Sequence, residues 1–276
     1  MTRGRRRFAC TCLVSSCLLF SRVVGQVSIP PSSPGTESCF LLYELGVGEV
    51  RRNPSEACLT RVTPASTFKV PHALAALDAG VLSPNEVFSW DGSGEWPTSA
   101  RRAHTLASAV RNSVVWYFQR VAERLGADRE QAYLKKLAFG NMDSGSGLTS
   151  FWIGGSLQVT PEEQLAFWVR LYENELPIAP AAVAAVKQIL VEPSGTVVNA
   201  AGEQRFGDRW PSNTVVSAKP GSATDRSGRG VRWLAGHVDT NGRAFVFVSC
   251  VIGPRDLEPN AAIDLAARSL RASKVL

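Results

Sequence analysis

The chain has 276 residues, of which 45% are hydrophobic, so it is long enough to bury one large core or two lobes that share a cleft. Five arginines in the first 25 residues carry most of its formal charge of +6, and no acidic residue accompanies them. The remaining chain is almost neutral, which removes the main argument for a nucleic-acid partner.

Residues 1–25 have the pattern of a signal peptide. The arginines flank a short apolar run, Phe8 to Phe20, that is too short to span a membrane and ends near small residues. We expect export to the periplasm by the general secretory or the twin-arginine route, and no membrane attachment after cleavage. A lipid attached at Cys17 is disfavoured, because the apolar run continues past that cysteine.

Three cysteines follow the leader: Cys39, Cys58 and Cys250. Cys39 opens an apolar segment, and Cys58 closes a second segment after the Gly46-Val47-Gly48 turn. A β-hairpin over 38–60 brings these two ends together, and an oxidising compartment allows the bond. We predict a Cys39–Cys58 disulfide and a buried free thiol at Cys250.

In chain order, a loose arm over 26–36 and the hairpin precede a helix that contains Ser66, is kinked near Pro71 and ends near Gly80. Helical periodicity then dominates, most clearly over 107–125, 129–137, 161–173 and 180–190. After residue 195 the pattern predicts strands over 214–218, 231–238 and 244–252, followed by a helix over 261–270.

Strands at both ends of the chain predict an α+β fold with one antiparallel sheet flanked by helices. We expect residues 26–276 to form a single catalytic domain. Its α/β lobe comprises about 26–82 and 191–276, and an all-helical lobe of about 83–190 is inserted. The cleft between the lobes is the expected place for a site.

The stretch Pro64-Ala65-Ser66-Thr67-Phe68-Lys69-Val70-Pro71 contains the strongest chemical signal. Ser66 and Lys69 are three residues apart, so a helix places them on one face with the amine in reach of the hydroxyl. Apolar neighbours favour the neutral amine, which can accept the serine proton. Alone, this pattern is more often a helix N-terminus with a capping serine and an exposed lysine.

Four further motifs follow in order: Ser113-Val114-Val115, Phe139-Gly140-Asn141, Phe151-Trp152-Ile153-Gly154 and Lys219-Pro220-Gly221-Ser222. Together with Ser66 and Lys69, they resemble the class D, or oxacillinase-type, serine β-lactamases over about residues 60–252. Ser108 also fits the Ser-x-Val pattern, but the aromatic residue and glutamine that the family places next follow Val115.

The resemblance implies a fold of the serine β-lactamase and penicillin-binding transpeptidase type, and hydrolysis of β-lactam antibiotics that confers resistance. Ser66 would form the acyl-enzyme, and Lys69, as a carbamate of carbon dioxide (N6-carboxylysine), would be the general base. Ser113 would pass a proton to the lactam nitrogen beside Lys219. The backbone N–H groups of Ser66 and Ser222 would hold the oxyanion.

The resemblance also implies four substrate-binding residues: Val115, Trp152, Gly221 and Ser222. Gly221 and Ser222 belong to the last motif. Val115 would line the pocket around Lys69, and Trp152 would donate its indole N–H to the carbamate. Without the other motifs, Trp152 reads as a core aromatic and Lys219 as a solvated charge. The sequence predicts no metal site and no other cofactor. We expect a monomer or a homodimer.

Two residues depart from the family pattern. Phe139 replaces the usual tyrosine, and Pro220 replaces the usual Thr or Ser, whose hydroxyl grips the substrate carboxylate together with an arginine beyond the last strand. No arginine stands in 258–262. Nearby replacements are Ser222 or Thr224 for the hydroxyl and Arg255 or Arg232 for the cation. Proline itself is tolerable if this strand lies at the sheet edge.

Three other readings remain open at this level. The first is a β-lactam sensor domain that stays acylated, although the membrane helices and protease domain of such sensors are missing from the sequence. The second is a cell-wall transpeptidase, which would normally lack Trp152 and the Val115 pocket. The third is an inactive binding protein, for which Pro220 is the only hint.

Overall fold

A computed structural model describes Met1 and residues 35–52 and 56–276. The predicted signal peptide, most of the arm over 26–36 and the expected cleavage site lie outside the described residues. Within the described part, no helix is long and apolar enough to cross a membrane.

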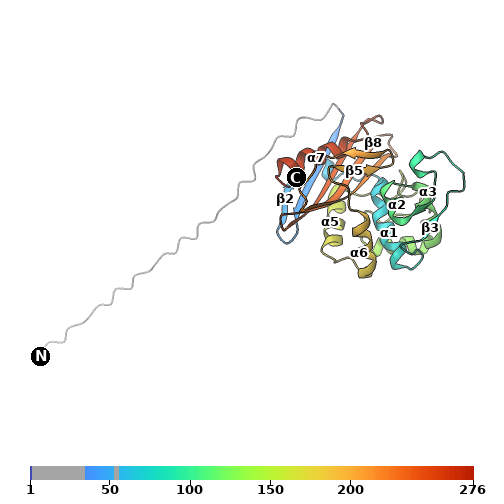
Figure 1. The fold of residues 1–276 in the computed structure, drawn as a ribbon, viewed down its shortest axis with the longest axis horizontal. Coiled ribbons are helices and arrows are strands. Elements are labelled where there is room, and N and C mark those ends of the chain that lie inside the picture. Colours follow the sequence, from blue (N-terminus) through green and yellow to red (C-terminus); the bar gives the residue numbers. More distant parts are fainter. Residues whose placement is uncertain (2–34, 53–55) are drawn as a thin grey trace.

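The central element is a five-stranded antiparallel sheet with the strand order β2-β1-β9-β8-β7. Its strands are β1 (Glu37–Glu44), β2 (Gly48–Arg52), β7 (Thr214–Thr224), β8 (Gly230–Thr240) and β9 (Arg243–Gly253). The first two come from the start of the chain and the other three from its end, and they lie side by side in one sheet (Figure 1). The predicted α+β class is confirmed.

Both faces of the sheet are covered, so its central strands read as almost continuous apolar runs. Helix α7 (Ala261–Ala272) packs on one face against residues such as Phe40, Leu234 and Phe247. Helix α5 (Pro161–Tyr172) packs on the opposite face against β1, β8 and β9. A capping box between Thr160 and Glu163 and the proline at its first position fix the start of α5.

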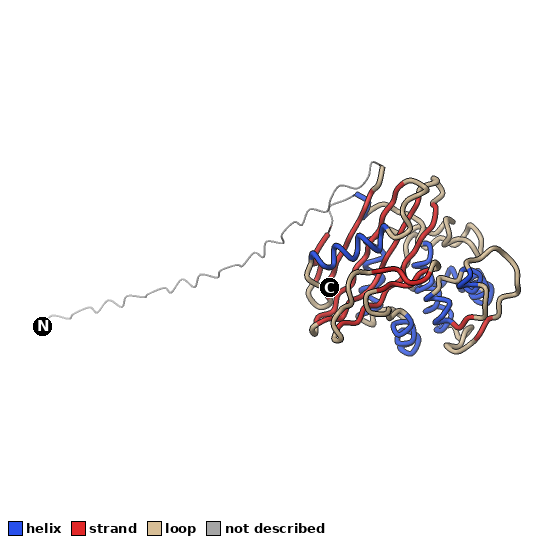
Figure 2. The backbone as a smooth tube through the Cα atoms, turned by 45° about the horizontal axis from the view of Figure 1, so that its top comes forward, coloured by secondary structure: helices blue, strands red, loops and turns tan. Residues whose placement is uncertain are grey.

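The remaining helices form a group beside the sheet (Figure 2). They are η2 (Ala65–Phe68), α1 (Lys69–Asp78), α2 (Leu106–Arg111), α3 (Val115–Leu125), α4 (Ala127–Lys136) and α6 (Pro180–Ile189), with the short turns η1 (Glu56–Cys58) and η3 (Thr98–Ala100) outside them. Gly80 ends α1 in the left-handed conformation, as predicted, with φ +65°.

The helix predicted over 107–125 is wrong as one continuous element. The chain forms α2 and α3 instead, separated by Asn112, Ser113 and Val114. Ser113 has φ 54°, a left-handed conformation that a helix interior does not contain. Periodicity could not reveal this break, because both helices bury the same kind of apolar face.

The predicted Cys39–Cys58 disulfide is confirmed, with its two Cα atoms 5.1 Å apart. Cys58 lies in η1, which follows β2, so the bond joins β1 to the segment that leads toward Ser66. Cys250 is a buried free thiol, also as predicted, and lies opposite Cys39 on β9.

Two small antiparallel ladders were not predicted. One joins β3 (Val87–Phe88) to β4 (His104–Thr105), and the other joins β5 (Thr196–Asn199) to β6 (Gly202–Arg205). The β5–β6 hairpin contributes residues to the site described next.

Candidate active site

Ser66 and Lys69 lie where the short helix η2 passes into α1. Lys69 Nζ donates a hydrogen bond of 2.8 Å to Ser66 Oγ, so the expected pairing of amine and hydroxyl is present. Ser66 is partly exposed, whereas Lys69 is only 1% exposed. The hydroxyl therefore faces the cleft and the amine lies behind it.

Burial lowers the pKa of Lys69 well below its usual value, and the positive charge of Lys219 lowers it further. Lys69 Nζ lies 5.6 Å from the ring centroid of Phe118, which belongs to a cluster of buried rings with His72, Trp152 and Phe68. The neutral amine is thus favoured, and a neutral amine can accept a proton or add carbon dioxide.

Trp152 is fully buried, and its indole Nε1 has no hydrogen-bond partner among the described residues. Its backbone carbonyl accepts a hydrogen bond from Thr63 Oγ1 at 2.9 Å, which fixes the segment beside η2. Phe139 replaces a tyrosine and is equally buried, 5.5 Å from Phe68 between ring centroids. A buried N–H group that donates no hydrogen bond destabilises the fold. The indole of Trp152 therefore needs an acceptor that the described residues do not supply.

A second lysine–serine pair faces the first across the cleft. Lys219 Nζ donates to Ser113 Oγ at 2.5 Å, and the left-handed turn between α2 and α3 presents that hydroxyl. Burial lowers the pKa of Lys219 to about 8, while the negative charge of Glu192 opposes that shift. Burial in turn raises the pKa of Glu192 to about 7. At neutral pH, Lys219 keeps its proton.

Strand β7 is the last strand of the sheet, which confirms the predicted edge position of Pro220. The segment 190–192 pairs with Val216–Ala218, so the free part of the edge begins next to Lys219. A Cβ on Gly221 would lie 3.2 Å from the carbonyl oxygen of Pro64 and 3.3 Å from the amide nitrogen of Thr67. The small residue allows this edge to approach the backbone around Ser66.

A hollow of about 290 Å³ opens between these elements. The residues that line it are Ser66, Ser113, Val115, Asn199, Ala200, Ala201, Pro220, Gly221, Ser222, Trp233, Pro259 and Ile263. Both serine hydroxyls of the lysine pairs reach it, together with Val115, Gly221 and Ser222 from the predicted site. Trp152 and the two lysines do not line it and lie deeper.

Residues 199–201, Trp233 and Ile263 in this lining were not predicted, whereas Pro259 lies in the stretch 258–262 where the carboxylate anchor was expected. Ser222 is the only one of the four expected replacements for the carboxylate anchor that lines the hollow. The guanidinium of Arg232 is bound to the carbonyl oxygens of Ala223, Val231 and Leu257 instead. Thr224 and Arg255 also lie outside the lining.

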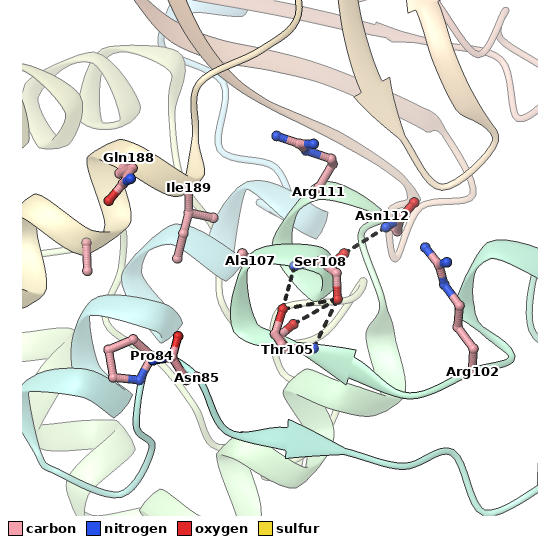
Figure 3. Close-up of a pocket in the computed structure, with 11 residues that line it drawn as sticks. Pro84, Asn85, Arg102, Thr105, Ala107, Ser108, Arg111, Asn112, Gln188 and Ile189 are labelled. Carbon is pink, nitrogen blue, oxygen red and sulfur yellow. Dashed lines mark hydrogen bonds between the residues drawn. The ribbon is translucent and has the colours of Figure 1, made fainter.

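A larger hollow, of about 570 Å³, lies between α2, α6 and residues 84–85 (Figure 3). It contains none of the five motifs. Ser108 borders it and forms a capping box with Thr105 at the start of α2. Ser108 therefore fixes a helix end, whereas Ser113 reaches Lys219. Among the described residues, no cluster of His, Cys, Asp and Glu could hold a metal ion.

The sequence between residues 39 and 271 matches the penicillin binding protein transpeptidase domain. A probable β-lactamase of Bacillus subtilis, YbxI, is 30% identical over 243 residues, which cover 88% of this chain and 84% of that protein. The chain belongs to the class D β-lactamase family. The β-lactamase OXA-2 of Salmonella typhimurium is 40% identical over 168 residues.

The match to OXA-2 covers 57% of this chain and 61% of OXA-2, so the chain spans less than two thirds of that relative's length. A solved class D β-lactamase from Nostoc has a TM-score of 0.77 at 26% identity, over 87% of this chain and 95% of that one. The C-terminal domain of the Bacillus licheniformis BlaR penicillin receptor has a TM-score of 0.75 at 26% identity, over 88% and 92%. The class D fold thus occurs in both hydrolases and a receptor.

Proposed function

We propose that this protein hydrolyses β-lactam antibiotics through an acyl-enzyme on Ser66. The observation that carries the proposal is the pair of lysine–serine contacts that meet at one hollow, Lys69 with Ser66 at 2.8 Å and Lys219 with Ser113 at 2.5 Å. One pair supplies a nucleophile with a base behind it, and the other supplies a proton donor for the leaving nitrogen.

In the first step, Ser66 Oγ gives its proton to the base at Lys69 and bonds to the lactam carbonyl carbon. The backbone N–H groups of Ser66 and Ser222 hold the negative charge on the carbonyl oxygen. The carbon–nitrogen bond of the lactam then breaks, and Ser113 gives its proton to the nitrogen and regains one from Lys219. In the second step, water gives a proton to the base at Lys69 and bonds to the ester carbonyl carbon; the bond to Ser66 Oγ then breaks, Ser66 regains a proton from that base, and the opened product leaves.

The residues around Lys69 fit a carbamate on its Nζ. Burial lowers the pKa of the Lys69 amine and so favours the neutral form that can add carbon dioxide, and Trp152 Nε1 is a buried donor without an acceptor among the described residues. When present, the carbamate supplies the general base for both steps. Trp152 would hold the carbamate through its indole N–H, and Phe68, Phe118 and Val115 would keep water away from it.

A chromogenic cephalosporin, followed with purified wild-type protein and with Ser66→Ala, tests the proposal. We expect many turnovers per molecule for the wild type and none for Ser66→Ala. A stoichiometric burst without further product would contradict hydrolysis. It would favour the second candidate, a receptor that stays acylated, which the similarity to the BlaR domain supports.

We also propose that the protein acts in the periplasm after signal-peptide cleavage and protects its host from β-lactams. The Cys39–Cys58 disulfide supports an oxidising compartment. Expression in a β-lactam-sensitive Gram-negative host, with and without residues 1–25, is the test. Resistance that does not depend on the leader would contradict export by that segment.

A further inference from the structure

The hollow above Ser66 has four polar side chains in its lining: Ser66, Ser113, Ser222 and Asn199. Three of them belong to the proposed chemistry. Asn199 has no part in it, although the tip of the β5–β6 hairpin places it in the same hollow. Its Oδ1 accepts a hydrogen bond from the backbone N–H of Ala201 at 2.8 Å, and its Nδ2 donors have no partner among the described residues.

The position of the hairpin tip is fixed from two sides. Ser99 Oγ, in the short helix η3, donates to the carbonyl oxygen of Ala200 at 2.9 Å and ties the tip to the helical group. The backbone N–H of Val198 donates to Glu192 Oε2 at 3.2 Å. Strand β5 also contacts β7, the strand that carries Lys219, so the hairpin tip lies beside that strand.

A penicillin or cephalosporin carries a carboxylate on the ring fused to the lactam. A carboxylate in a desolvated site needs hydrogen-bond donors as well as a nearby positive charge. Pro220 offers no hydroxyl, and Arg232 is held by three carbonyl oxygens. No arginine lines the hollow. Within the part of the chain that the structure describes, two side-chain donors in this lining lack a partner, the Ser222 hydroxyl and the Asn199 amide, and only the amide lies on the β5–β6 hairpin opposite β7.

We infer that Asn199, carried by the β5–β6 hairpin, donates its side-chain amide to the substrate carboxylate and so replaces the hydroxyl that Pro220 lacks. The inference rests on the proposed function, because it names a binding residue for the same substrates. Lys219 supplies the positive charge, and the hairpin supplies the directed hydrogen bond.

Two substitutions distinguish the loss of the Asn199 amide donor from the loss of the turn that its Oδ1 stabilises. Asn199→Asp keeps an oxygen for the Ala201 N–H but removes the NH₂ group and adds a charge that repels the carboxylate. Asn199→Ala removes both. Asn213→Ala is the matched control, because Asn213 is an exposed asparagine just before β7 whose side chain bonds only to Asn241.

The readout compares benzylpenicillin with its methyl ester, in which the carboxylate is blocked. We expect both Asn199 variants to lower kcat/KM for the acid about ten- to hundredfold, the effect of one lost charge-assisted hydrogen bond. The ester should change by about threefold or less, and Asn213→Ala should change neither. Equal losses for acid and ester, or normal values for Asn199→Asp, would overturn the inference.

Mass spectrometry of the Ser66 adduct gives the acylation rate constant for the same compounds and does not require turnover. If the wild type is acylated but not hydrolysed, the proposed function fails while the comparison of acid and ester still decides the role of Asn199. If the wild type reacts normally and the Asn199 variants match it, only the inference fails. A wild type that neither acylates nor hydrolyses overturns both.

Discussion

Lys69 and Lys219 are both buried, but only Lys219 has a carboxylate, Glu192, that raises its pKa. The pKa of Lys219 therefore falls only to about 8, whereas that of Lys69 falls well below its usual value. The neutral form is thus favoured more strongly at Lys69 than at Lys219, which suits a base beside Ser66 and a proton donor beside Ser113.

This difference predicts the alkaline limb of the pH profile. Because Lys219 is cationic below its folded pKa of about 8, kcat/KM should fall about tenfold per pH unit once the pH exceeds that value. Glu192→Gln removes the charge that stabilises the ammonium, so the limb should move to lower pH. Steady-state kinetics from pH 6 to pH 10 measure both profiles. If Glu192→Gln left the alkaline limb at the same pH, the assignment of that limb to Lys219 would be contradicted.

A second prediction concerns the orphan indole of Trp152. Trp152→Phe keeps a ring in the core and removes the N–H, so activity should become dependent on added bicarbonate and the carbamate signal in carbon-13 NMR should weaken. Trp168→Phe is the control, because its Nε1 is also buried without a partner among the described residues, yet it lies on α5 and stacks on Tyr172. Equal responses of the two variants would argue against a carbamate contact.

At the scale of elements, α1 and α4 are joined by a buried pair, His72 and Glu130, whose side chains hydrogen-bond. The His72 ring lies 4.9 Å from the Trp152 ring and stacks on Phe118 at 5.8 Å between centroids, so the pair supports the Phe118 ring beside Lys69 and the Trp152 ring. Removing one partner of a buried polar pair leaves the other unsatisfied.

Glu130→Ala should therefore lower the free energy of unfolding by about 3–5 kcal/mol. Glu130→Gln keeps an acceptor for the imidazole and should cost less. Urea unfolding followed by tryptophan fluorescence measures both. If the two variants were equally stable, the hydrogen bond to His72 would contribute nothing to the fold.

The sequence predicted most elements because their signals are local. The Thr160-Pro161-Glu162-Glu163 start placed α5 correctly, and the alternation of turns and apolar runs placed β8 and β9 within two residues. The β5–β6 hairpin was missed, because its strands are four residues long and one of them, Gly202–Arg205, is polar throughout. The break at Ser113 was missed because neither glycine nor proline marks it.

The site residues were also easier to predict where they are close together in the chain. Ser66 and Lys69 are close in the chain, so helical spacing alone predicted their contact. Ser113 and Lys219 are 106 residues apart, and only the resemblance to a family brought them together before the fold was known. Asn199 belongs to no motif, and its place in the hollow depends on tertiary contacts with Ser99 and Glu192.

At the scale of the whole molecule, the Cys39–Cys58 disulfide closes a separation of 19 residues between the sheet and the segment before Ser66. Cys58→Ser should lower the free energy of unfolding by about 3 kcal/mol, since the unfolded chain regains the freedom that the loop restricts. Activity at 25 °C should be retained.

Thermal unfolding with and without reductant measures the loss. Cys250→Ala is the control, because its effect should not depend on reductant. A wild type that is insensitive to reductant, or a Cys58 thiol that alkylates without reduction, would contradict a stabilising bond.

The order of strands in the sheet also decides when the protein can fold. Strand β1 pairs with β9, so Glu44 meets Phe245 only after nearly the whole chain has been synthesised. Such non-local pairing makes folding slow and keeps strand edges open in the meantime. A nascent chain that ends before residue 243 has no β9, so the β1–β2 and β7–β8 pairs cannot yet join into one sheet. The Lys219–Ser113 contact lies on the sheet that this late strand completes, so half of the site depends on the last part of the chain to be made.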